Sequence, residues 1–273
     1  MEVLNILETS VDFEMLFAVD VNAPPICRNV ETYPMPKIED MHSALRGCTV
    51  FSELDLKQAY HQFPVLKDSQ KYLTVNTHMG LFAFKRLPNG IHSGPAIFQR
   101  IMDGLFADIP KAVSRLDDIL IVGTDYQDHL NTLSQVLERL LKYGFKLNKA
   151  KCKFLQSLVV FLGHLIDSAG LHPTMDKLAA VGDAPPPKDA VALKSFLGLI
   201  IFYSRFIPHH STVLAPLNSL LEKNAPWRWT KTEDNAFMAA KNLLLNSRTL
   251  VHYDETLPLV LSCDASSYGF FRM

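Results

Sequence analysis

Two adjacent aspartates, Asp117 and Asp118, interrupt a mainly apolar stretch that runs from residue 112 to 122. Short apolar segments on both sides of a polar pair predict two strands joined by a tight turn. Carboxylates held this close repel each other and favour their protonated forms. The pattern therefore predicts a hairpin that carries both carboxylates at its tip.

The patterns around this pair alternate between strand and helix. In chain order they predict a strand at 48–56, a helix at 95–106, the hairpin at 112–122, a helix between Asp125 and Gly144, and strands at 145–147 and 159–165. Another hairpin, at 71–87, is inserted between the first strand and its helix. Strand, helix, strand, strand, helix, strand is the order of a ferredoxin-like split βαβ sheet.

Asp55 ends the first predicted strand. In a ferredoxin-like sheet that strand lies beside the hairpin, so we expect Asp55, Asp117 and Asp118 to meet although they are distant in sequence. Two Mg²⁺ ions would keep three such carboxylates ionised and would supply the chemistry of phosphoryl transfer. An Asp-Asp pair on its own is more often an ordinary turn, and that explanation stays open at this point.

Composition excludes several other classes of protein. Of the 273 residues, 48% are hydrophobic and 20% are charged, which is typical of a globular protein with a sizeable core. No apolar run approaches the roughly 18 residues of a membrane span, and the four cysteines are too scattered for a zinc cluster or a disulfide framework. No lysine precedes Lys37. We therefore expect no targeting signal, no membrane partner and an intracellular location, cytoplasmic or nuclear.

Several ordered blocks give a more specific signal. The segment from Phe51 to Gln62 reads FSELDLKQAYHQ, and the blocks RLPNG, PAIFQ, LDDIL, FLGH and LKSFLG follow it in that order. Together they resemble reverse transcriptases of gypsy-type LTR retrotransposons, as a fragment of a Pol polyprotein. The resemblance extends from Tyr33 to Gly269 and so covers most of the chain.

The resemblance implies an α+β fold with a ferredoxin-like palm, partial fingers, a helical thumb and the truncated start of an RNase H-like domain. The expected parts are a degenerate fingers remnant with the segment leading into the palm at 1–47, the palm with a residual fingers hairpin at 48–168, the thumb at 169–228, a connection at 229–255 and the RNase H-like start at 256–273. Asp264 would be the first metal-binding aspartate of that last part. Its companion carboxylates have no counterpart, so we expect no ribonuclease H activity.

The resemblance also assigns roles at the hairpin. Asp55, Asp117 and Asp118 would bind two catalytic Mg²⁺ ions, for which Mn²⁺ can substitute. Arg115 stands where the family's signature tetrad usually begins with tyrosine. Its charge would suit pairing with a catalytic aspartate, in competition with a metal ion.

Four further residues match nucleotide- and primer-binding positions of the family. Tyr60 would pack under the incoming sugar, Asn89 would lie near the incoming nucleotide, and Leu162 and Gly163 would belong to the primer grip. Three of them have a structural alternative. Tyr60 can be a half-buried core tyrosine, Asn89 an ordinary turn asparagine, and Gly163 a glycine required by a bulge.

The implied function is that of an RNA-directed DNA polymerase, a nucleotidyltransferase that extends a primer 3′-hydroxyl by two-metal catalysis. Its partners would be a DNA primer on an RNA or DNA template and deoxynucleoside triphosphates. The basic residues that clamp the triphosphate in relatives have no clear counterpart upstream of Tyr33. The alternative is therefore a non-catalytic retroelement remnant that binds nucleic acid or protein.

Overall fold

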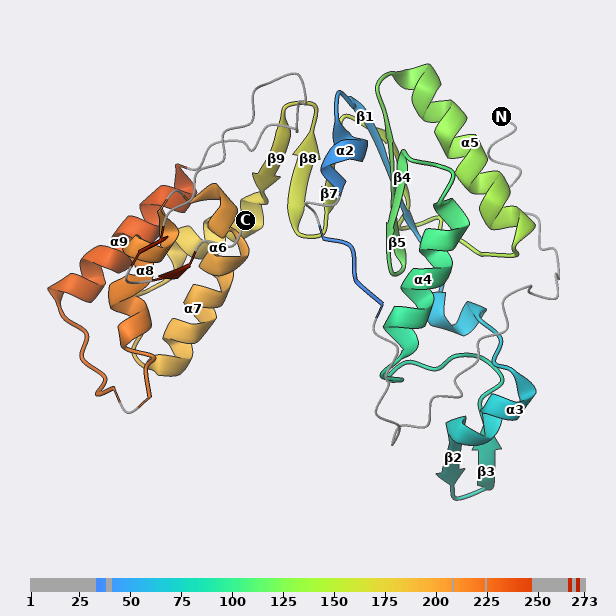
Figure 1. Ribbon diagram of the computed structural model, residues 1–273, viewed down its shortest axis with the longest axis horizontal. Coiled ribbons are helices and arrows are strands. Elements are labelled where there is room, and N and C mark those ends of the chain that lie inside the picture. Colours follow the sequence, from blue (N-terminus) through green and yellow to red (C-terminus); the bar gives the residue numbers. More distant parts are fainter. Residues whose placement is uncertain are drawn as a thin grey trace. The chain divides into compact units, whose positions relative to one another are not determined.

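The computed structural model describes residues 33–37, 41–207, 209–223 and 225–246, together with the backbone of 265–266 and 269–270. The chain forms two compact units, Met1–Phe161 and Leu162–Met273 (Figure 1). The strand predicted at 257–262 and Asp264 lie outside the described residues.

A four-stranded antiparallel sheet organises the first unit, with the strand order β4-β5-β1-β6 (Figure 1). Its strands are β1 (Val50–Asp55), β4 (Ala112–Arg115), β5 (Asp118–Gly123) and β6 (Lys153–Gln156). Helix α4 (Gly94–Phe106) follows β1, and helix α5 (Tyr126–Lys142) follows β5. This element order and strand order confirm the predicted ferredoxin-like sheet.

The core of this unit lies between the sheet and the two helices. Alternation along the strands turns Leu54, Ile119 and Ile121 to the helices, where they are fully buried against apolar side chains of α4 and α5. Helix α5 begins as predicted, because the Asp125 side chain accepts a hydrogen bond from the Asp128 backbone N–H. Burying each large apolar side chain contributes about 1.5–3 kcal/mol, so these contacts fix the sheet on its helices.

Several smaller elements complete the first unit. Helices α2 (His42–Leu45) and α3 (Lys67–Gln70) and the 3₁₀ turns η2 (Ala59–Gln62) and η3 (Lys71–Leu73) precede the hairpin of β2 (Thr74–Thr77) and β3 (Gly80–Ala83). That hairpin was predicted at 71–87. Strand β7 (Leu158–Phe161) ends the unit and lies against β1.

One predicted strand was wrong, and another is interrupted. Residues 145–147 form only one isolated bridge, between Leu147 and Leu56, and the sheet takes β6 as its fourth strand. The Gln62 side chain accepts the backbone N–H of Lys146, which keeps that group from a strand partner. The strand predicted at 159–165 is divided by a turn, in which Leu162 and Gly163 both have positive φ, 49° and 76°. Two such residues in succession suit a tight turn between strands.

The second unit is mainly helical. It opens with the hairpin of β8 (His164–Asp167) and β9 (Gly170–Pro173), and its remaining elements are α6 (Met175–Asp183), α7 (Ala190–Phe202), η4 (Ser204–Phe206), α8 (His210–Ser219), α9 (Lys231–Leu245), β10 (Ala265–Ser266) and β11 (Gly269–Phe270). Helix α9 packs against α6 and α8. Within the described part of the chain, no helix has both the length and the apolar character needed to cross a membrane.

Gly123, at the end of β5, lies in close contact with α5. A Cβ atom at this position would lie 2.5 Å from His129 Cβ and 2.7 Å from the His129 backbone nitrogen. We expect Gly123→Ala to destabilise the first unit by about 3 kcal/mol, because backbone must move to admit the methyl group. Gly104 in α4 has open space around it, so Gly104→Ala should instead stabilise the unit by about 0.5–1 kcal/mol. Amide hydrogen exchange in β5 measures the stability of the first unit in both variants. Equal changes in stability would contradict the expectation.

Candidate functional site

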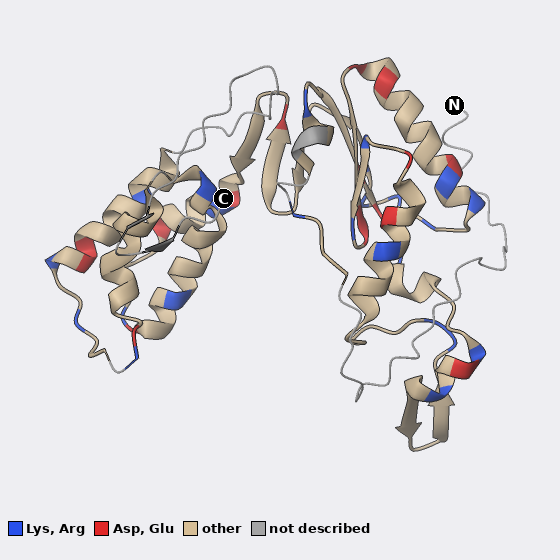
Figure 2. Ribbon diagram, in the orientation of Figure 1, with Lys and Arg blue, Asp and Glu red and all other residues tan. Residues whose placement is uncertain are grey.

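The predicted aspartates lie at one end of the central sheet. In β1 and β5, Asp55 stands directly opposite Asp118. Asp117 occupies the turn before β5, and its carbonyl accepts the backbone N–H of Leu56. Because Leu54 and Ile119 face the helices, Asp55 and Asp118 face the other side of the sheet. Figure 2 shows acidic residues at the tip of the β4–β5 hairpin.

A buried glutamine fixes the turn that carries Asp117. The Gln99 side chain, which is fully buried in α4, donates to the Ser114 carbonyl at 2.9 Å and accepts the Leu116 N–H at 2.8 Å. Its amide also donates to Asp103 at 2.7 Å. Leu116 has a φ of 54°, a conformation that leucine adopts only when its surroundings impose it. Gln99 therefore holds a strained turn from both sides.

Two lysines at the start of β6 and just before it lie beside carboxylates of β1. Lys151 Nζ lies 3.4 Å from Asp55 Oδ2, and Lys153 Nζ lies 2.7 Å from the carboxylate of Glu53, two residues earlier on β1. Glu53 and Asp55 share a face of the strand. The site thus contains four carboxylates and two ammonium groups.

The electrostatics of the site favour an added cation. The pKa of Asp118 is raised to about 6, chiefly by burial and also by the charges of Asp117, Glu53 and Asp55, while Lys151 lowers it. Among the described residues, no three potential ligands converge tightly enough to enclose an ion as they stand. The donors are nevertheless carboxylate oxygens, the ligands that Mg²⁺ prefers, and their mutual repulsion is what a divalent cation relieves. The donor set therefore fits Mg²⁺.

Asp118 should destabilise the fold when it is ionised. Its folded-state pKa is raised above the ordinary value of 3.8, so stability falls as the pH rises from about 4 to about 6 and stays reduced above that. We expect Asp118→Asn to stabilise the first unit on the order of 1–2 kcal/mol at pH 7.5, after allowance for solvent screening of this half-buried group. Amide exchange at pH 4 should show almost no difference in stability between Asp118→Asn and the unaltered chain. An equal gain in stability at pH 4 and pH 7.5 would contradict this.

The structure places the other predicted residues as follows. Tyr60, in η2, packs its ring 5.1 Å from that of Phe98; burial and the nearby charge of Asp117 raise its pKa. Asn89 is exposed in a turn before Gly90, which has a φ of 89°. Arg115 stands opposite Asp118 across β4 and β5, yet no ion pair joins it to an aspartate within the described part of the chain. The cation that contacts Asp55 is Lys151.

The turn at Leu162 and Gly163 is held within the second unit. The Tyr203 hydroxyl donates to the Gly163 carbonyl at 2.6 Å, and a Cβ on Gly163 would lie 3.0 Å from the Phe202 ring. Glycine is thus required here by a close ring contact as well as by its positive φ.

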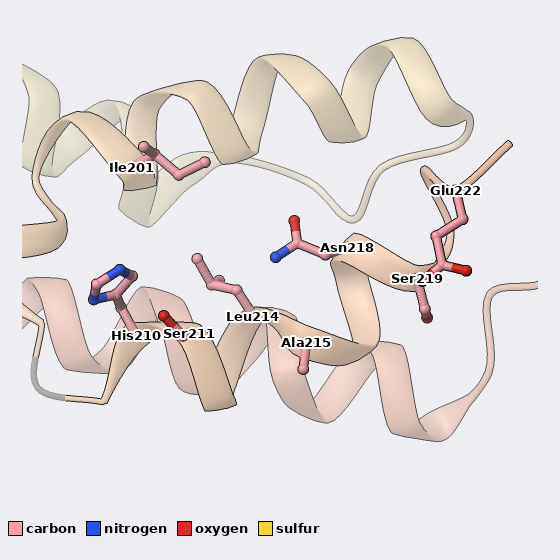
Figure 3. A pocket seen from close by; sticks show the side chains of 8 residues that line it. All are labelled: Ile201, His210, Ser211, Leu214, Ala215, Asn218, Ser219 and Glu222. Carbon is pink, nitrogen blue, oxygen red and sulfur yellow. The ribbon is translucent and has the colours of Figure 1, made fainter. Parts of the chain in front are cut away.

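A cavity of about 320 Å³ lies in the second unit, along one side of α8. Figure 3 shows His210 and Asn218 on α8, Glu222 just after that helix and Ile201 on α7 among the lining side chains. Of the predicted site residues that the structure describes, none lines it. It is therefore separate from the carboxylate site.

Gln99 and Glu53 were not predicted as site residues, and Lys151 was not predicted to lie beside a carboxylate. The sequence holds one signal for Gln99, a polar residue in the apolar face of a predicted helix. The contacts of Lys151 and Glu53 depend on the pairing of β1 with β6, which the sequence pattern misplaced.

A family model described as reverse transcriptase (RNA-dependent DNA polymerase) matches residues 15–166, more than half of the chain. The chain belongs to this reverse transcriptase family. A second model, described as an RNase H-like domain found in reverse transcriptase, matches residues 229–271. That range takes in the segment expected to be a connection as well as the expected RNase H-like start.

Relatives of this reverse transcriptase segment include the transposon Tf2-3 and Tf2-7 polyproteins of Schizosaccharomyces pombe. Each is 34% identical over 236 residues, which cover 86% of this chain and 18% of the polyprotein. The chain thus spans less than a fifth of these relatives. The match confirms the resemblance to retrotransposon Pol proteins that the motif blocks predicted.

Solved structures of the foamy viral protease-reverse transcriptase are similar in fold. One in complex with double-stranded DNA has a TM-score of 0.76 and 25% identity and covers 82% of this chain and 40% of the viral one. Another, with an RNA/DNA hybrid, has a TM-score of 0.68 and 27% identity and covers 75% and 28%. These similarities confirm the α+β reverse transcriptase fold.

Proposed function

We propose that this chain is the core of an RNA-directed DNA polymerase, which extends a DNA primer on an RNA or DNA template with deoxynucleoside triphosphates. The observation that supports this most directly is the pairing of Asp55 with Asp118, with Asp117 in the adjoining turn. Membership of the reverse transcriptase family supports it independently. The foamy viral relatives were solved with double-stranded DNA and with an RNA/DNA hybrid, the kinds of duplex this reaction uses and forms.

In this proposal Asp55, Asp117 and Asp118 bind two Mg²⁺ ions, and Mn²⁺ can replace them. When bound, such ions activate the primer hydroxyl and stabilise the charge that develops on the phosphates. Lys151 balances the Asp55 charge and moves away as a cation is bound. Tyr60 and Asn89 contact the incoming nucleotide.

The proposal keeps the division into parts expected from the sequence. These parts are a fingers remnant with the segment leading into the palm at 1–47, the palm with a fingers hairpin at 48–168, the thumb at 169–228, a connection at 229–255 and the RNase H-like start at 256–273. Leu162 and Gly163 grip the primer, at a turn whose carbonyl is tied to Tyr203.

A primer-extension assay tests the proposal. The purified chain should add deoxynucleotides to a DNA primer on an RNA template with Mg²⁺ or Mn²⁺, and EDTA should stop the reaction. Absence of incorporation at high concentrations of protein and nucleotide, with either metal ion, would support the non-catalytic remnant instead.

Arg115 offers a test of the altered signature position. We expect Arg115→Tyr to raise incorporation by about five- to tenfold, because an aromatic ring would support the primer end and a cation would leave the neighbourhood of Asp118. Arg115→Gln separates the two causes, since it removes the charge without adding a ring. The assay is steady-state extension; unchanged or lower activity of Arg115→Tyr would show that arginine already suits this position.

A further inference from the structure

A buried serine–histidine pair lies within the sheet–helix core, on the strand that carries Asp55. Ser52 of β1 and His129 of α5 are both fully buried, and Ser52 Oγ lies 2.7 Å from His129 Nε2. The same oxygen accepts the backbone N–H of Leu155 at 3.0 Å. The serine hydroxyl can accept from Leu155 and still donate its own hydrogen to the imidazole, so these contacts form a relay from β6 through β1 to α5.

The imidazole is suited to accept that hydrogen. Burial lowers the pKa of His129, and the Val50 backbone and the Asp128 carboxylate oppose this only in part. A neutral imidazole has one free acceptor nitrogen, whereas the protonated form has none. The glycine at position 123 lets the His129 backbone come close enough to β5 for the ring to reach Ser52.

The relay lies at an irregularity in the sheet. Phe51 pairs with Gln156 and Glu53 pairs with Lys153, so the single residue between them on β1 faces two residues on β6. This is a β-bulge. Leu155, one of those two residues, has a φ of 55°, which a leucine adopts only when its surroundings require it. Its N–H bonds to the Ser52 hydroxyl in place of a strand carbonyl.

The bulge determines which side chains of the β6 segment reach the carboxylates. A shift of one residue in strand pairing turns every side chain to the opposite face. With the bulge present, Lys153 meets Glu53 and Lys151 meets Asp55. Without it, the β6 segment would lose this register, and the lysines would leave the carboxylates.

We propose that the Leu155–Ser52–His129 relay is a positioning device that holds the β1–β6 bulge and thereby keeps Lys151 beside the Asp55 carboxylate. Ser52 and His129 are positioning residues, since neither contacts the carboxylates. The inference rests on the proposed function only for the role of Asp55 as a metal ligand. The geometry of the bulge can be tested without it.

Amide hydrogen exchange tests the geometric part. Ser52→Ala should speed exchange at Leu155 by about tenfold, the usual effect of losing one hydrogen bond, while Ile121 and Val122 of β5 stay within about twofold. Thr132→Val is the matched control, because it removes another buried hydroxyl of this unit that bonds only within α5. If Ser52→Ala fails to fold, Ser52→Ala with Leu155→Gly replaces it, since glycine accepts a positive φ. Unchanged exchange at position 155 in a folded variant lacking the Ser52 hydroxyl, relative to the same chain with Ser52, would overturn the inference.

Mn²⁺ binding, followed by electron paramagnetic resonance, tests the link to Asp55. Ser52→Ala and Lys151→Met should each tighten Mn²⁺ binding by about two- to fivefold, the worth of one exposed ion pair. The double variant should match Lys151→Met alone, because both changes remove the same lysine from Asp55. Additive effects, or Ser52→Ala behaving like Thr132→Val, would overturn the inference. Absence of Mn²⁺ binding in the unaltered chain would instead contradict the proposed function, and the exchange experiment would still decide the relay.

Discussion

Changing Asp117 to asparagine should reduce primer extension by about a thousandfold or more. The change keeps the shape of the side chain and removes one negative charge from the group that is proposed to hold two divalent cations. Electrostatic stabilisation of this kind contributes several kcal/mol to catalysis, and about 1.4 kcal/mol corresponds to a factor of ten. Single-turnover incorporation of one nucleotide, at saturating primer–template, measures the chemical step with the least interference from binding.

Asp68→Asn is the matched control for this prediction. Asp68 is an exposed aspartate of α3 in the same unit, so its replacement changes the net charge equally without touching the sheet. We expect its activity to stay within about twofold of the unaltered chain, as for most surface substitutions. Asp117→Asn activity within tenfold of the unaltered chain would remove Asp117 from the proposed metal site.

The placement of Asp55 beside Asp118, next to the turn that carries Asp117, could be predicted from sequence because it depends on backbone pairing alone. Once 48–56 is a strand and 112–122 a hairpin, the ferredoxin-like order brings Asp55 beside Asp118. The predictions for α4 and α5 succeeded for a related reason, since the apolar period and the Asp125 cap are local signals.

The fourth strand could not be placed in this way. Residues 145–147 and 153–156 are both short and partly apolar, and the choice between them depends on side-chain contacts that no local pattern encodes. Gln62 engages the backbone of Lys146 from 84 residues away, and the Ser52 hydroxyl holds Leu155 at the bulge. The lysine contacts of Asp55 and Glu53 follow from that pairing, which is why the sequence did not indicate them.

The role of Gln99 in the site also depends on contacts that no local sequence pattern encodes. The PAIFQ block lies in the predicted helix, but the hydrogen bonds of its glutamine depend on the position of the β4–β5 turn. Its amide satisfies two backbone groups on either side of Arg115. In the sequence, Gln99 is only one polar residue on the apolar face of a predicted helix, and nothing local indicates which groups it bonds.

Gln99→Leu is therefore expected to have two large effects. It leaves the Ser114 carbonyl and the Leu116 N–H without partners, which should destabilise the first unit by about 3 kcal/mol. It also frees a turn that is strained at Leu116, so Asp117 should shift. A displacement of about 1 Å at a catalytic group can lower the rate by about a hundredfold. Amide exchange in β5 and single-turnover incorporation measure the two effects.

The comparison with Gln135→Leu separates the contribution of these hydrogen bonds from that of an apolar substitution in a helix. Gln135 is exposed on α5 and bonds only to the Asn131 carbonyl of its own helix. Its replacement should leave both measurements nearly unchanged. Should Gln99→Leu lose stability yet retain full incorporation, the turn would keep its shape without the glutamine, and packing of Asp117 against β1 would be what positions the carboxylate. Loss of both properties together would instead identify the buried amide as the group that holds Asp117 in place.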